Sequence, residues 1–531
     1  MSSLESFVYN SNELELQRFS NLILSLFEEF LMAVSLVALT LVLVVALYFK
    51  YNPLEHSRKF MVRRFVNWFP MGMSYAFLYM ARYNLNVSKN ALGPLMNKES
   101  FGLIFGAGTI IYGLSFLING PLVDKIGGKR GIVIATLGSS LANIAMGVVT
   151  YLLLNQRWPF DLTLTFAILY SINMFFQSYG AVSIIKVKAY WFHVRERGIF
   201  GAIFGTLISF GVYFAFDWGQ AIADASRSSI QNPTPFQIAF RQIFALEGRP
   251  GDATWLVFFI PASILLVWTL LDAWLIKDTP AKAKFEDFDT HDASSGEMHQ
   301  EYTMRETLRL VFGNPVLMLI AVVEFTTGVI RNGVMQWYFI FAKEVPQPGA
   351  EFFLKHWGLL LCISGIVGGF AIGYASDHIF HSRRSPPVAF AGVGIFVLAL
   401  ILLATLYTSP VTVGICAVGI SLLSISIHSL MSGTAAADFG GRKLTATASG
   451  ITDGFVYLGT GLQSVSLGYL TNHSWLFWPA FLVPFAVLSV YIAVKMWGHL
   501  PEATKKYLVT VEKVTMERVQ VVEVSNPEKE S

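Results

Sequence analysis

The sequence predicts an all-α membrane protein in which two bundles of six helices follow one extra N-terminal helix. Two observations lead to this prediction. Hydrophobic residues make up 54% of the 531 residues and charged residues only 14%, whereas charged residues make up roughly a quarter of an average soluble domain. Thirteen apolar runs are also long enough to cross a bilayer as helices, which takes about 20 residues.

The thirteen predicted spans fall into one single span and two sets of six. The single span is 31–49, and the first set is 66–88, 102–122, 132–151, 162–186, 197–217 and 255–275. The second set is 314–341, 357–375, 386–407, 410–433, 445–470 and 476–498. The resulting parts are an external segment 1–30, the extra helix 31–49, a basic linker 50–65, a bundle 66–275, a linker 276–313, a bundle 314–498 and a tail 499–531.

The distribution of basic residues predicts the orientation in the membrane. Five basic residues follow the first span, namely Lys50, Arg58, Lys59, Arg63 and Arg64, while the segment before it holds only Arg18. Short loops on the cytoplasmic side carry the excess of lysine and arginine. We therefore expect a multi-pass protein of the cell (inner) membrane, with its N-terminus outside and its C-terminus in the cytoplasm.

Several classes of protein are disfavoured by composition and motifs. A net charge of +3 does not indicate a nucleic-acid partner. Cys362 and Cys416 both lie inside apolar spans, which indicates packing rather than a disulfide or a metal site. No nucleotide-binding or hydrolytic motif stands out. We expect no enzyme activity, no cofactor and no metal.

Two loops at equivalent places suggest an internal repeat. Each follows the second span of its bundle and combines glycine, aspartate and basic residues. The first loop contains Gly120, Asp124, Lys125, Gly127 and Arg130, and the second contains Gly373, Asp377, Arg383 and Arg384. Glycine allows close approach of helices, the aspartate is expected to face a neighbouring helix terminus, and the basic residues anchor the turn at the interface.

The first loop resembles the signature loop of the major facilitator superfamily. That resemblance implies the major facilitator fold, with a substrate site between the two bundles and alternating access by rocking of the bundles. The two loops would then act as conformational switches.

Two arginines lie deep in corresponding spans. Arg82 is about sixteen residues into the first span of one bundle, and Arg331 is about seventeen residues into the first span of the other. An arginine at mid-membrane costs about 2.5 to 3.5 kcal/mol on insertion scales. Because the guanidinium group stays charged and binds phosphate or carboxylate oxygens bidentately, the pair predicts an anion site.

The residues around these arginines resemble the organophosphate/phosphate antiporter family, which includes carriers of glycerol-3-phosphate and hexose-6-phosphate. The resemblance rests on the strings Tyr79–Asn84, Arg331–Gly333 and Trp191–Gly198. It implies that Arg82 and Arg331 bind the phosphoryl group of a substrate that is exchanged for inorganic phosphate. Tyr112 matches a tyrosine that lines the cavity in that family.

Three cavity groups of the family are absent here, since Tyr83, Phe116 and Ile208 stand where basic residues are expected. Asn86, together with Glu324 and Asp453, is a candidate replacement. The two acids are either partners of a cavity arginine or a proton or ion-pair site, because an intramembrane acid is either paired or titrates. His428 is expected to make a polar contact between helices.

The sequence thus predicts a transporter that exchanges a small organophosphate for phosphate. Two alternatives stay open: a membrane sensor of a phosphorylated ligand that keeps the transporter fold, and a proton-coupled carrier of a carboxylate or other anion. The expected partners are the small anionic substrate, inorganic phosphate and the lipid bilayer, and a monomer is expected to suffice.

Overall fold

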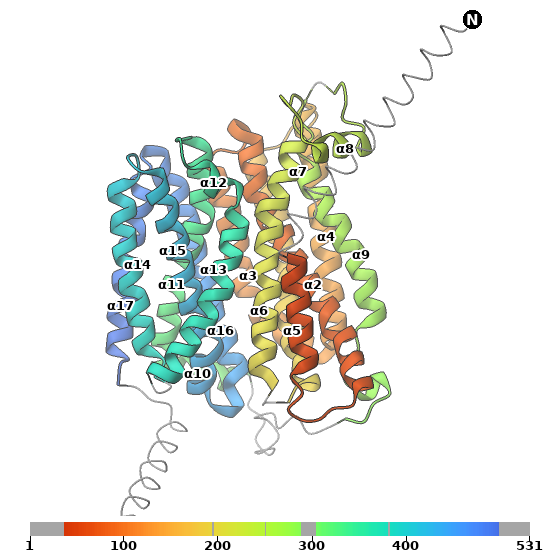
Figure 1. Ribbon diagram of the computed structural model, residues 1–531, viewed down its shortest axis with the longest axis vertical. Coiled ribbons are helices and arrows are strands. Elements are labelled where there is room, and N and C mark those ends of the chain that lie inside the picture. The colour runs from red at the N-terminus through yellow and green to blue at the C-terminus, as the bar shows by residue number, and fades with distance from the viewer. Residues whose placement is uncertain (1–36, 194–195, 250, 288–303, 381–382, 499–531) are drawn as a thin grey trace, which may run out of the picture. The chain divides into compact units, whose positions relative to one another are not determined.

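The computed structural model consists of helices joined by short connections, and no β-strand occurs in the residues that it describes. These are residues 37–193, 196–249, 251–287, 304–380 and 383–498. The predicted external segment 1–30 and the tail 499–531 lie outside them. The helices are labelled in Figure 1.

The chain forms two compact units. The first comprises Met1–Gly108, Leu117–Thr290 and Phe352–Cys362. Its helices are α2 (Arg58–Leu92), α4 (Gly128–Leu154), α5 (Leu162–Trp191), α6 (Arg197–Tyr213), α7 (Gly219–Ala225), α8 (Pro235–Ile243) and α9 (Leu256–Leu275), together with most of α3 (Lys98–Ile126). A helical segment Val37–Lys50 precedes them. Within this unit α4 packs against α5 and α9, and α2 packs against α6 and α9.

The second unit comprises Thr109–Phe116, His291–Glu351 and Ile363–Ser531. Its helices are α10 (Met304–Gly313), α11 (Pro315–Glu344), α14 (Ser385–Thr405), α15 (Pro410–His428), α16 (Ala436–His473), α17 (Phe477–Lys495) and most of α13 (Trp357–Tyr374). The short helix α12 (Glu351–Lys355) precedes α13. Helix α14 packs against both α15 and α17, and all three lie in the left part of Figure 1.

Polar side chains at the helix starts explain where several helices begin. The Ser57 hydroxyl accepts a hydrogen bond from the Phe60 amide, so α2 begins at Arg58, eight residues before the predicted span. Asn97 caps α3 and Asp161 caps α5 in the same way. Proline at the first position supports α11 and α15, because its missing N–H would have no partner there. The connection between the predicted spans 197–217 and 255–275 contains α7 and α8.

Among the described residues, nine helices are long and apolar enough to cross a membrane: α3, α4, α5, α9, α11, α13, α14, α15 with its following turn, and α17. The other four predicted spans overlap Val37–Lys50, α2, α6 and α16, and residues 31–36 of the first of them lie outside the described residues. The total of thirteen spans therefore stays a prediction, while the all-helical membrane architecture is confirmed.

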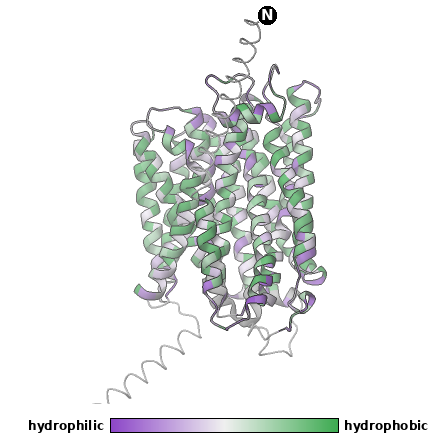
Figure 2. Cartoon of the chain, turned by 45° about the vertical axis from the view of Figure 1, so that its right-hand side comes forward, coloured by the Kyte–Doolittle hydropathy of each residue, from purple (hydrophilic) through white to green (hydrophobic). Residues whose placement is uncertain are grey.

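Large apolar side chains are exposed along the sides of the long helices. Leu270 and Trp274 of α9 are 73% and 75% exposed, and Phe390 of α14 is 61% exposed. Figure 2 shows hydrophilic residues gathered near the helix ends, while most of each helix is hydrophobic. Exposed apolar surface of this extent is what a lipid environment requires.

Helices α11 and α16 approach each other at two glycines. A Cβ atom on Gly328 would lie 1.9 Å from the Val456 carbonyl oxygen, and one on Gly459 would lie 2.1 Å from the Phe325 carbonyl oxygen. Only glycine permits backbones to pack this closely. Thr460 and Asn332 add a hydrogen bond of 2.8 Å across the same contact.

Three helices pass into π-helical turns, at Phe214–Trp218 after α6, Ala375–Ile379 after α13 and Ser429–Ala435 after α15. A π-helical turn holds an extra residue and breaks the regular α-helical register, and such turns are frequent at functional sites. The last of these turns separates His428 from α16.

Candidate functional site

Arg82 is fixed inside the first unit by residues of α2 and α5. Its side chain is 1% exposed, and its Nε donates a hydrogen bond of 2.9 Å to the Gln177 side-chain oxygen of α5. The guanidinium carbon lies 4.7 Å from the centre of the Tyr79 ring, a cation–π distance. The Tyr170 hydroxyl donates to the Arg82 carbonyl at 3.2 Å. The arginine is therefore both buried and oriented.

Gln177 is itself held by a buried network of neutral side chains. Its amide nitrogen donates to the Ser139 hydroxyl and to the Asn173 oxygen, both at 3.2 Å. Asn173 and Asn143 donate to the carbonyl of Ala81, next to Arg82, at 3.0 and 3.2 Å. A satisfied network of this kind fixes side chains in one arrangement.

Asn86 lies one helical turn after Arg82 on α2. It is fully buried, and neither its side-chain oxygen nor its nitrogen makes a hydrogen bond among the described residues. A buried amide without partners costs about 1 to 3 kcal/mol. A buried polar group without partners needs an explanation, and ligand binding by the Asn86 amide would provide one.

Tyr112 is fully buried and lies in the segment Thr109–Phe116 of α3, which belongs to the second unit. Its ring centre lies 4.3 Å from that of Tyr457 on α16 and 5.0 Å from that of Phe116. The tyrosine is thus part of an aromatic cluster.

In the second unit, Glu324 of α11 pairs with His428 of α15. The His428 Nδ1 lies 2.7 Å from Glu324 Oε2, which also accepts a hydrogen bond of 3.1 Å from Thr327. Glu324 is fully buried, and among the described residues its other oxygen, Oε1, has no hydrogen-bond partner. Glu324 was a candidate partner for a cavity arginine, but its closest ionic contact is with a histidine that sequence reasoning assigned to helix packing.

Two further charged residues, Arg331 and Asp453, interact electrostatically with this pair. Arg331 is half-buried on α11, and both it and Asp453 of α16 act electrostatically on His428. The Ser432 hydroxyl, in the π-helical turn after His428, donates a hydrogen bond to Asp453. The structure therefore gathers one base, two acids and a histidine in the second unit.

The first switch loop joins α3 to α4 at Gly127. This glycine has φ of +90°, and a Cβ atom there would lie 3.0 Å from the Asp278 carboxylate. Asp278 accepts a hydrogen bond of 2.8 Å from the Lys129 amide at the start of α4. The helix terminus is thus capped by Asp278, a partner from the linker.

Asp124 was expected to face a helix terminus, but it is exposed and pairs with Lys186 of α5 at 2.7 Å. Lys125 and Arg130 are exposed and Gly120 is half-exposed, in keeping with a position at the end of the helices. In the second loop, Arg384 and the Arg383 carbonyl both hydrogen-bond to Ser376. The side chain of Asp377 lies outside the described residues.

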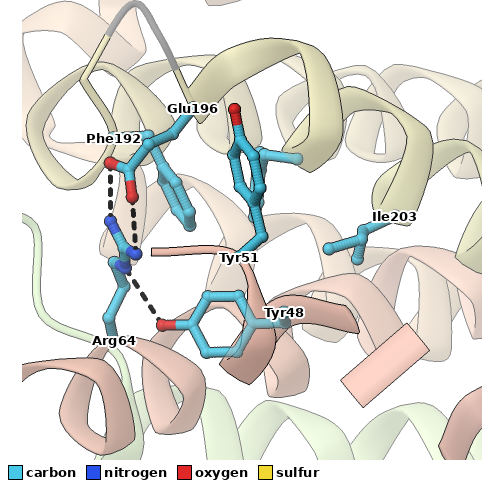
Figure 3. A pocket seen from close by; sticks show the side chains of 7 residues that line it. Tyr48, Tyr51, Arg64, Phe192, Glu196 and Ile203 are labelled. Atoms are coloured by element: carbon cyan, nitrogen blue, oxygen red, sulfur yellow. Dashed lines mark hydrogen bonds and ion pairs between the residues drawn. The ribbon is translucent and has the colours of Figure 1, made fainter. Parts of the chain in front are cut away.

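Sequence reasoning missed a buried ion pair between α2 and the α5–α6 connection. Arg64 donates two hydrogen bonds of 2.8 Å to the two Glu196 carboxylate oxygens, and its Nε donates to the Tyr48 hydroxyl at 3.0 Å. Figure 3 shows the two-pronged contact and the tyrosine beside it. Arg64 and Glu196 are 1% and 3% exposed. Tyr48 attaches the extra N-terminal helix to this ion pair.

Burial raises the pKa of Glu196, but the neighbouring His56 and Arg64 side chains outweigh burial and lower this pKa to about 2. His56 Nε2 lies 3.7 Å from the carboxylate. Glu196 therefore stays ionised at any physiological pH. Its position within the string Trp191–Gly198 was the one signal that the sequence offered.

A second missed contact involves Asp217. Its carboxylate accepts hydrogen bonds from the amides of Gly358 and Leu359, at 2.7 and 3.1 Å, at the start of α13. A carboxylate at a helix N-terminus satisfies free N–H groups and interacts favourably with the helix dipole. The contact joins the first turn of α13, which belongs to the first unit, to the π-helical turn after α6.

Comparison with known proteins gives matches along most of the chain. The description "Major Facilitator Superfamily" fits residues 63–464. The glycerol-3-phosphate transporter of Bacillus subtilis is 24% identical, over 80% of this chain and 90% of that protein. The membrane sensor protein UhpC of Escherichia coli is 23% identical, over 78% and 88%. A probable hexose phosphate transport protein of Chlamydia trachomatis is 23% identical, over 83% and 92%.

Among solved structures, a bacterial homologue of the human lysosomal transporter Spinster, in an inward-facing and unoccupied conformation, superposes with a TM-score of 0.61. It shares 13% identity, over 85% of this chain and 98% of that chain. At this identity the likeness concerns the fold.

Proposed function

Because the chain belongs to the Major Facilitator Superfamily, we propose that it is a secondary active transporter that exchanges a small organophosphate for inorganic phosphate. The substrate is of the sugar phosphate or glycerol phosphate class, which is the class named for two of its relatives. Transport proceeds by alternating access. The protein acts in the cell membrane as a monomer, with its N-terminus outside and its C-terminus in the cytoplasm.

The observation that carries this proposal is the buried, oriented Arg82 with the unsatisfied Asn86 one turn away. A planar guanidinium donates two parallel hydrogen bonds to phosphoryl oxygens. Asn86 supplies an amide that can donate to a phosphoryl oxygen or accept from a sugar hydroxyl. Arg331, at the corresponding place of the second repeat, supplies the second guanidinium for the same phosphoryl group, and Tyr112 contributes an aromatic wall.

Exchange of radiolabelled phosphate tests the proposal. Purified protein in proteoliposomes preloaded with phosphate is expected to exchange it, and one phosphate ester is expected to compete while plain carboxylates do not. Arg82→Lys and Arg331→Lys keep the charge but lose the planar fork, so each is expected to weaken phosphate binding about 10- to 100-fold. Arg157→Lys, in an exposed loop, serves as the matched control. Full exchange in both site variants would contradict the proposal.

A second candidate function is a membrane sensor that binds the phosphorylated ligand and signals its presence without transport. The observation that favours it is the similarity to the sensor UhpC along 78% of this chain. Ligand binding shifts a two-state equilibrium without any flux. Binding of a phosphate ester by purified protein that gives no exchange would select the sensor over the transporter.

A further inference from the structure

The Glu324–His428 pair has a chemistry that phosphate exchange does not require. A carboxylate and an imidazole lie 2.7 Å apart between α11 and α15, where the carboxylate is fully buried. Neutral hydrogen-bonding residues would join the two helices at a lower desolvation cost. Ionisable groups at such places in membrane proteins mark proton or ion pathways.

The titratable groups around the pair are few. Helix α11 contributes Arg331, which acts electrostatically on His428. Helix α16 contributes Asp453, which acts on both members of the pair and accepts a hydrogen bond from Ser432 in the π-helical turn. The charged residues of the other helices that pack on α11 lie toward helix ends: Lys495 is the last residue of α17, and α10 carries its charges before α11 begins. Helix α15 carries two titratable residues, His428 and the buried free thiol of Cys416, which lies three turns before it.

Charge balance within this group depends on one proton. When His428 is protonated, the positive charges of His428 and Arg331 balance the negative charges of Glu324 and Asp453. Without that proton the group carries one net negative charge, and burial makes such an excess costly. The unpartnered Glu324 Oε1 offers a second place for the same proton.

We infer that Glu324 and His428 together form a proton-binding site, and that the binding of an anionic substrate at Arg331 is linked to the uptake of one proton from solution by this site. The inference rests on the proposed function for the identity of the anion. An arriving phosphate adds negative charge beside the pair, which favours the protonated state, and by thermodynamic linkage the proton favours phosphate binding to the same degree. Flux of phosphate is then coupled to protons.

The π-helical turn connects this site to α16 in the second unit. His428 ends α15, and the turn that follows carries Ser432, which holds Asp453 of α16. A change of charge on His428 acts directly on Asp453. Protonation is thereby connected to the place where α15 passes into α16.

Calorimetry of phosphate binding tests the linkage. Titration in buffers of different ionisation enthalpy counts the protons taken up, and phosphate itself contributes because it titrates near neutral pH, at about 6 to 7. Wild type is expected to take up more protons per phosphate than Glu324→Gln or His428→Gln, and its affinity is expected to fall more steeply with rising pH, by up to about tenfold per pH unit. Ser421→Ala is the control that keeps the wild-type proton count. Ser421 lies two turns before His428 on α15, and its hydroxyl makes no hydrogen bond among the described residues.

Infrared titration of the ligand-free protein gives an independent answer. Between about pH 5 and pH 9, the range in which histidine titrates, a carboxyl or imidazole band is expected to titrate in wild type and to be lost in Glu324→Gln and His428→Gln. If wild type shows no titrating band that the two variants lack, the proton site is overturned, even if phosphate exchange is fast. If phosphate neither binds nor exchanges, the proposed function fails, and the infrared titration alone decides the proton site. If phosphate does bind, equal proton counts by calorimetry in wild type and both variants would also overturn the proton site.

Discussion

The two arginines occupy corresponding places in the two repeats, but their surroundings differ. Arg82 is held by Gln177 within a network of neutral amides and hydroxyls. Arg331 lies in a group that contains Glu324, His428 and Asp453. The repeat therefore preserved the place of the guanidinium and not its electrostatic environment.

This difference suggests a division of labour. The residues that orient Arg82 are neutral, so they do not form an ion pair with it. The positive charge that Arg82 offers to an anion is therefore independent of pH. The charge around Arg331 depends on pH because a histidine belongs to it. The first region is then suited to binding the phosphoryl group and the second to linking that binding to protons.

The largest effect is expected from giving the first region an acid. Gln177→Glu places a carboxylate 2.9 Å from the Arg82 Nε, so an internal ion pair forms and competes with the substrate. Phosphate binding is expected to weaken about 100-fold or more, and Gln177→Ala less, in line with the loss of one hydrogen bond to a charged group. Equilibrium binding to folded protein measures this, and unchanged affinity in Gln177→Glu would argue against a role of Arg82 in binding.

The Arg64–Glu196 pair provides a reference ion pair that does not titrate at physiological pH. Glu196→Gln leaves Arg64 buried without a counter-charge and is expected to destabilise the protein by about 3 kcal/mol. Since the pKa of Glu196 in the folded protein, about 2, lies below its ordinary value of 4.5, this stabilisation is present above pH 4.5 and is lost as the pH falls toward 2. Thermal denaturation measures the difference in stability between wild type and variant. This difference is expected to be constant from neutral pH to about pH 5 and smaller below pH 5.

A smaller effect is expected from making the second region resemble the first. Asp453→Asn removes one negative charge near His428, so that the remaining groups balance without the proton. Phosphate exchange is expected to persist, with fewer protons taken up at neutral pH. Calorimetry in paired buffers, as for the Glu324 variant, measures the change. A proton count equal to that of wild type would remove Asp453 from the linkage.

The smallest effect is expected at the exposed Asp124–Lys186 pair. The two side chains are 65% and 26% exposed, and ion pairs in such settings contribute about 0 to 1 kcal/mol. Lys186→Ala should therefore change the melting temperature little. A large loss of exchange in a stable Lys186→Ala protein would show that this loop contact matters for conformational change and not for folding.

Much of the architecture follows from local patterns. Apolar runs and loop glycines predicted an all-helical membrane protein of the Major Facilitator Superfamily, which the family match confirms. The strings around Arg82 and Arg331 predicted a resemblance to carriers of glycerol-3-phosphate and hexose phosphate, and proteins with such names are among the relatives. Helix ends were displaced where a cap decides them, as at Ser57. Caps depend on a single hydrogen bond that hydropathy does not report.

The partners of the buried charges could not be predicted, because they lie far away in the sequence. Glu324 and His428 are 104 residues apart, Arg82 and Gln177 are 95 apart, and Asp278 caps a helix 149 residues before it. A charged residue inside an apolar run shows that a partner must exist. Which residue satisfies it depends on how the helices pack. The roles of Arg82, Arg331, Tyr112 and Asn86 in binding stay predictions.

The glycine contacts between α11 and α16 have a practical consequence for measuring motion in this protein. Since the backbones touch at Gly328 and Gly459, sliding or tilting of one helix against the other would require the carbonyls of Val456 and Phe325 to separate from them. The two helices are therefore expected to move as one body. Spin labels on their lipid-exposed faces, such as one at Leu462, would report a constant distance and serve as an internal ruler against which changes elsewhere are read.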